Sequence, residues 1–134
     1  MERADRYVGE FETDDLVYDA SFPMLTKGVT LRAGQGLLKR GTLLAISGGT
    51  AGTGEVVVLG AAAVENETLE IYGVLTDDKD TGTDASGEAV AAEAYVTGKY
   101  NANKILVADG HTLSAADECE LRKLGIFLAT KMPL

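Results

Sequence analysis

Few residues of this chain belong to the types that carry out chemistry. His111 is the only histidine and Cys119 the only cysteine among 134 residues. Neither has companions arranged as in a catalytic triad, a Cys–His pair or a two-histidine metal site. A single cysteine also excludes an intrachain disulfide. We therefore expect His111 to be a surface-turn histidine and Cys119 to be a buried, inert thiol.

An acidic segment in the second half of the chain offers the carboxylates that Ca²⁺ prefers. An EF-hand loop beginning at Asp78 would place Asp80 at its third position. It would then put Gly82 at the fifth position, Thr83 where glycine is required, and Ala89 at the twelfth position, which must be acidic. The mismatch favours a solvated loop over a calcium site. A loosely held cation is the alternative, on Asp77, Asp78, Asp80 and Asp84.

The glycine-rich stretch from Gly36 to Thr42 also fails as a nucleotide-binding motif. It has the length of a phosphate loop but lacks the Lys-Ser/Thr pair after the second glycine, and no βαβ pattern surrounds it. Acidic residues are plentiful enough to supply a carboxylate pair for glycoside hydrolysis, but plentiful surface acids are the simpler interpretation. We expect no catalytic residues, no cofactor and no metal, and hence no enzyme.

Length and charge limit the remaining functions. A chain of 134 residues fits one domain, and its 46% hydrophobic content is ordinary for a globular protein. The net charge of −9 argues against a nucleic-acid partner. Residues 20–54 carry four basic residues and no acidic one, so a complementary acidic-to-basic contact with a partner is an alternative to simple solubility. No apolar stretch approaches a signal peptide or a membrane span, which predicts a cytoplasmic location in the cell that makes the protein.

The elements that would position these residues are mainly strands. Apolar and β-branched runs bounded by glycine or polar clusters predict seven short strands. They lie at residues 29–31, 43–46, 56–59, 69–76, 89–100, 105–107 and 126–128. A flexible loop is expected at residues 47–54, where small residues dominate, and an exposed acidic loop at residues 77–87.

One helix is predicted near the C-terminus. Ser114 is a suitable N-cap, and Asp117 three residues later resembles the acidic partner of a capping box. Glu118 and Glu120 favour the positive end of the helix dipole. Gly125 is well placed as the left-handed residue that ends the helix. The predicted fold class is therefore mainly β, with one short helix.

The N-terminus differs from the rest of the chain. Residues 1–20 contain seven acidic residues and two arginines, interspersed with apolar side chains. Their loose alternation is typical of a polar edge strand or of a segment that becomes ordered when it docks. We therefore divide the chain into an extended acidic N-terminal arm, residues 1–20, and a single β-rich domain, residues 21–134.

The order of these segments resembles the lambda-type head decoration proteins of tailed bacteriophages. The resemblance covers roughly residues 16–128 and rests on co-occurrence rather than on any one motif. VTGKYN and the helix that ends in LGIFL are its most specific parts. The matching segments in order are FPMLTKGVTLRAGQGLLKRGTLLAI, IYGVLTDDKDT, AEAYVTGKYN and LRKLGIFL.

This resemblance implies a small barrel-like fold and a structural role in the virion. Family members bind as homotrimers at three-fold positions on the outer surface of the expanded shell and stabilise it against packaged DNA. The implied partner is the major capsid protein of the same phage. The implied location of the protein is the host cytoplasm during assembly and the outer capsid surface in the virion. The resemblance also implies capsid contacts for the apolar residues of the arm and its exit. These are Tyr7, Val8, Phe11, Leu16, Val17, Tyr18, Phe22 and Pro23.

Two other functions remain open. A phage fibre or tail component, or another adhesion-type binding module, would bind a glycan or receptor and ignore capsids. A small trimeric β-enzyme would need clustered carboxylates at its subunit boundaries. If the decoration role holds, removal of residues 1–19 is expected to weaken shell binding and to leave the domain folded.

Overall fold

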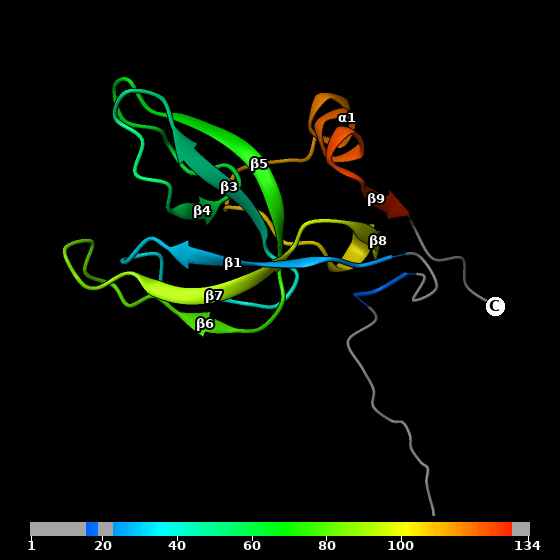
Figure 1. Cartoon of the computed structure of the whole chain (residues 1–134), viewed down its shortest axis with the longest axis horizontal. Coiled ribbons are helices and arrows are strands. Elements are labelled where there is room, and N and C mark those ends of the chain that lie inside the picture. The colour runs from blue at the N-terminus through cyan, green and yellow to red at the C-terminus, as the bar shows by residue number, and fades with distance from the viewer. Residues whose placement is uncertain (1–15, 19–22, 130–134) are drawn as a thin grey trace, which may run out of the picture.

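The computed structural model describes residues 16–18 and 23–129, and strands dominate these ranges (Figure 1). Five of them close into a barrel in which β1 and β4 run parallel and the other neighbouring pairs run antiparallel. The expected β-rich, barrel-like fold is confirmed. In their order around the barrel the strands are β1 (Thr26–Leu31), β4 (Val56–Val58), β3 (Leu43–Gly48), β5 (Thr68–Leu75) and β7 (Val90–Tyr95).

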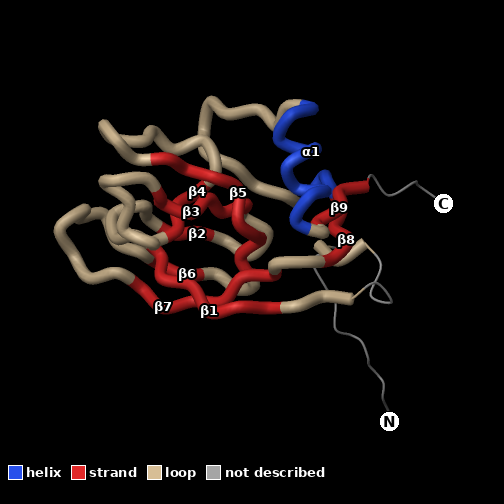
Figure 2. The backbone as a smooth tube through the Cα atoms, turned by 45° about the horizontal axis from the view of Figure 1, so that its top comes forward, coloured by secondary structure: helices blue, strands red, loops and turns tan. Residues whose placement is uncertain are grey.

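The remaining elements form two small sheets and one helical end. β2 (Leu37–Leu38) pairs with β6 (Lys79–Asp80), so the segment predicted as a loop at residues 77–87 contains a short strand. β8 and β9 pair in parallel, and Figure 2 shows both beside α1 at one end of the molecule. The bounds are β8 Gly98–Asn101, a 3₁₀ turn Ala102–Lys104, α1 Ala115–Leu124 and β9 Ile126–Ala129.

The long strand predicted at residues 89–100 is wrong, because the chain changes sheets within it. β7 ends at Tyr95 in the barrel, and β8 begins at Gly98 in the second sheet. Gly98 has φ = 140°, and a Cβ there would lie 2.4 Å from the hydroxyl oxygen of Tyr100. Only glycine fits such a position without strain. The short strand predicted at residues 105–107 is reduced to a single bridge between Thr42 and Leu106.

Strand β3 is buried on both faces and separates two apolar cores. Because side chains alternate along a strand, Leu44 joins one core and Leu43 joins the other. The first core draws its residues from the barrel strands and β2. The second lies between the barrel wall and the helical end. Its buried members are Leu16, Leu43, Ala45, Val57, Leu59, Val74, Tyr100, Leu121 and Ile126.

The predicted helix limits are confirmed. Ser114 and Asp117 form the reciprocal capping box, and Gly125 is left-handed with φ = 93°. Leu121 is the one fully buried residue of α1, which therefore covers the core through a narrow stripe. Cys119 is exposed, so the prediction of a buried thiol is wrong. Cys119 lies two positions before Leu121, about 200° around the helix, and therefore faces away from the core.

Replacement of Gly125 by valine is expected to destabilise the domain by about 1–2 kcal/mol, the usual cost of a side chain in left-handed backbone. The added Cβ would also come within 3.3 Å of Thr97 Cγ2. Urea unfolding measures the loss. Gly28→Val is the matched control, because Gly28 lies in β1 with no atom near its Cβ position. Equal stability of the two variants would contradict the role of Gly125.

Candidate functional site

Four of the eight residues predicted to contact a capsid lie within the described ranges. Leu16, Val17 and Tyr18 precede the barrel, and Pro23 leads into β1. The other four, Tyr7, Val8, Phe11 and Phe22, lie outside the described residues.

Residues 16–18 run along β8 and pair with it through one isolated bridge. Val17 pairs antiparallel with Tyr100. The Tyr18 N–H donates to the Lys99 carbonyl at 2.9 Å, and the Asn101 N–H donates to the Leu16 carbonyl at 2.8 Å. The ammonium group of Lys99 lies 5.3 Å from the centre of the Tyr18 ring. These contacts fix the direction in which the chain enters the domain.

Burial divides these predicted contact residues. Leu16 is only 1% exposed and belongs to the second core, so its side chain is not available to a partner. Val17 and Tyr18 are half-buried, while Pro23 is exposed. The Pro23 carbonyl accepts a hydrogen bond from the Thr97 hydroxyl at 3.2 Å. The N-terminal arm predicted at residues 1–20 therefore includes a segment, residues 16–18, that packs as part of the domain.

A groove opens beside Leu16, and we call it the Lys39 groove. It consists of two adjoining hollows of about 400 and 390 Å³ that share Lys39 and Leu106. The apolar side chains of Leu37 and Leu106 are 56% and 43% exposed. The first hollow is lined by Leu16, Lys39, Arg40, Asp78, Asn103, Lys104 and Leu106. The second is lined by Gln35, Leu37, Leu38, Lys39, Thr42, Val58, Leu106, Val107, Ala108 and Asp109.

Basic side chains dominate the first hollow. Arg40 is held in place, because its guanidinium donates to the Thr76 carbonyl at 2.8 Å and to the Tyr95 hydroxyl at 2.9 Å. Its backbone N–H donates to the Asp78 carboxylate at 2.8 Å. Lys39 and Lys104 are exposed, and neither forms an ion pair with a residue in the described ranges. The hollow is suited to a negatively charged segment.

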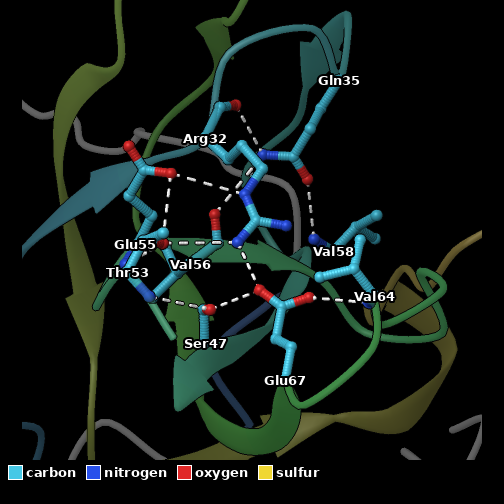
Figure 3. A network of polar contacts seen from close by, with 9 residues as sticks. All are labelled: Arg32, Gln35, Ser47, Thr53, Glu55, Val56, Val58, Val64 and Glu67. Carbon is cyan, nitrogen blue, oxygen red and sulfur yellow. Dashed lines mark hydrogen bonds and ion pairs between the residues drawn. The ribbon is translucent and has the colours of Figure 1, made fainter. Parts of the chain in front are cut away.

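A second polar cluster surrounds the side chain of Glu67 (Figure 3). This side chain is only 1% exposed. One carboxylate oxygen accepts from the Arg32 guanidinium at 2.6 Å and from the Ser47 hydroxyl. The other oxygen accepts from the Val64 N–H at 3.1 Å. Glu55 binds the same guanidinium from its other side at 3.4 Å.

This arrangement stabilises structure and leaves Glu67 poorly suited to acid–base chemistry. The hydrogen bond from Arg32, followed by those from Ser47 and Val64, lowers the pKa of Glu67 from 4.5 to about 2. A general acid or base works best with a pKa near the working pH. Both oxygens of this carboxylate are already engaged. Sequence reasoning missed the cluster, because Arg32 and Glu67 are 35 residues apart and belong to no motif.

The other residues considered for chemistry also have structural partners. His111 is half-buried and lies 3.1 Å from Asp117, the capping residue of α1. The Ser114 N–H, with a contribution from His111, lowers the pKa of Asp117. In the acidic segment, Asp80 and Asp84 accept hydrogen bonds from Gly82 and from Ser86. Across the described ranges, no three His, Cys, Asp or Glu side chains gather as metal ligands would.

Among the described residues, none of the helical segments has the length and apolar character needed to span a bilayer. No protein-family model matches the sequence, and no curated protein matches it.

Proposed function

We propose that this chain is a structural virion protein that binds the outer surface of an expanded phage capsid. It acts as a homotrimer at three-fold positions and stabilises the shell against the pressure of packaged DNA. Its partner is the major capsid protein of the same phage. The proposal rests on the ordered resemblance of segments to the lambda-type decoration proteins, together with the barrel fold.

One structural observation supports the proposal most directly. Residues 16–18 are paired with β8 by an isolated bridge and backbone hydrogen bonds, and acidic residues 1–15 directly precede them in the chain. An extended segment of this kind can add a strand to an exposed sheet edge of a partner. In this proposal the barrel is the rigid body, and residues 1–15 make the contact with the capsid.

The energetics favour many weak attachments on a regular lattice. Ordering each residue of an arm costs about 1–2 kcal/mol, which the new contacts must offset. In a trimer, binding of one arm raises the effective concentration of the other two near their sites. A trimer therefore binds a shell more tightly than a single copy, with no change in the contacts of each arm.

The test is co-sedimentation of the full chain with expanded and unexpanded shells of the capsid protein. We expect saturable binding to expanded shells alone. Binding to neither shell would reject the decoration role and would favour a fibre or adhesion module. Glycan and receptor arrays would then test for binding to such ligands.

A deletion variant tests the arm, and the structure sets its limit. Removal of residues 1–19 would take away Leu16, which is buried in the second core, so this deletion is expected to destabilise the domain as well as to weaken shell binding. Removal of residues 1–13 leaves residues 16–18 and their pairing with β8 in place. This shorter deletion is expected to keep the circular dichroism spectrum and to lower shell affinity. Undiminished shell binding would exclude a role for the arm.

A further inference from the structure

The Lys39 groove begins where the acidic segment meets the domain. Leu16 lines its first hollow together with Lys39 and Lys104, and its backbone is fixed by the pairing with β8. Residues 1–15 are therefore joined to the wall of the groove itself. Five residues of extended chain, from Phe11 to Leu16, reach at most about 17 Å.

Charge is complementary across this junction. Residues 1–15 contain six acidic residues and two arginines, and four of the acids fall within the last six positions. In the first hollow, Lys39, Arg40 and Lys104 outnumber Asp78. The ammonium groups of Lys39 and Lys104 are exposed, which leaves them accessible to carboxylates.

Apolar surface is also complementary. Leu37 and Leu106 are largely exposed in the adjoining hollow, where a soluble domain gains by covering them. The acidic segment carries aromatic and aliphatic residues at Tyr7, Val8 and Phe11; the first two precede its densest run of acids, and Phe11 lies within that run. A short tether gives these residues an effective concentration in the millimolar range, so weak contacts are sufficient.

From these observations we infer that the Lys39 groove is the docking site for residues 7–15 of the same chain. The carboxylates that precede Leu16 lie against Lys39 and Lys104, and Phe11 covers Leu37 and Leu106. The contact belongs to the free protein and does not depend on the proposed capsid role. A partner that binds the acidic segment must first displace it from the groove.

Paramagnetic relaxation in the full chain tests this inference. Cys119 is exposed and is the only cysteine, so Cys119→Ser combined with Gly9→Cys gives one site for a nitroxide label. In ¹⁵N spectra the backbone amide peaks of Lys39, Lys104 and Leu106 are expected to be about twofold or more weaker than the same peaks after the nitroxide is reduced. At about 1 M salt the screening length falls to about 3 Å, and the peaks should largely recover.

Charge variants separate docking from mere tethering. Neutralising the acids of the segment should restore the groove peaks, as should the double change Lys39→Glu and Lys104→Glu. The first variant carries Glu10→Gln, Glu12→Gln, Asp14→Asn and Asp15→Asn. A control neutralises four exposed acids elsewhere and should leave the broadening intact: Glu65→Gln, Glu70→Gln, Glu88→Gln and Glu93→Gln.

Two results would overturn the inference. Broadening that persists after either groove or segment charges are changed would show that tethering alone brings the label near. A mixture of two samples tests whether the segment in the groove comes from the same chain or from a second copy. One sample carries the spin label and no ¹⁵N, and the other is ¹⁵N-labelled and carries no spin label. Broadening in that mixture would assign the groove to a second copy, whereas no broadening in it supports docking within one chain.

Discussion

Replacement of Tyr100 by alanine is expected to lower the free energy of unfolding by about 3–5 kcal/mol, the range for removing a large aromatic side chain from a core. Tyr100 is fully buried, and its ring lies 5.4 Å from that of Tyr95, centre to centre. It belongs to the core between the barrel and the helical end. Its backbone also pairs with Val17 on one side and Leu128 on the other. Loss of this side chain therefore weakens the junction between the barrel and the second sheet.

Tyr100→Phe is the matched control for this prediction. It keeps the ring and removes the hydroxyl that donates to the Thr97 carbonyl at 2.8 Å. The lost hydrogen bond should cost about 1 kcal/mol. Urea denaturation followed by circular dichroism measures both variants. If alanine costs no more than phenylalanine, the ring does not carry the packing at this junction.

The same junction shows where sequence reasoning succeeds and where it stops. The helix was predictable because its signals are local: Ser114 and Asp117 cap its start, and Gly125 ends it. The change from the barrel to the second sheet after Tyr95 was not predictable, because the residues before and after this break both favour strands. The break depends on the close packing of Tyr100 over Gly98, which a one-dimensional pattern does not contain.

Burial of Leu16 could not be predicted for a related reason. Leu16 lies among acidic residues, and its surroundings in the sequence indicate an exposed arm. Its burial depends on pairing with β8, more than 80 residues later in the chain. The Lys39 groove has the same origin, since it joins Leu16 to Lys39 and Lys104. Composition predicted an acidic-to-basic contact with a partner as an alternative, but only the fold shows that Lys39, Arg40 and Lys104 line one hollow.

Replacement of Glu67 by glutamine is expected to change how stability depends on pH. Because the native state lowers the pKa of Glu67 from 4.5 to about 2, the unfolded chain binds a proton at this group more readily than the folded chain does. The carboxylate therefore contributes its full stabilisation above about pH 4.5. That contribution is lost as the pH falls from 4.5 towards 2.

The variant should be less stable than the parent at pH 7, because glutamine cannot offer two carboxylate oxygens to Arg32, Ser47 and Val64. It should also lose less stability than the parent on acidification, so the two curves converge near pH 2. Urea midpoints measured from pH 7 to pH 2 test both expectations. Glu70→Gln, an exposed change in β5, is the control and should follow the parent throughout.

Convergence is the decisive feature, because a general loss of packing would lower the curve equally at every pH. Parallel curves for parent and variant would mean that the Arg32 and Ser47 contacts do not lower the pKa of Glu67. Arg32→Met provides an independent check, since it removes the strongest of those contacts and leaves the carboxylate buried. Its acid transition should be shallower than that of the parent, because the pKa of Glu67 then moves back towards its value in the unfolded chain.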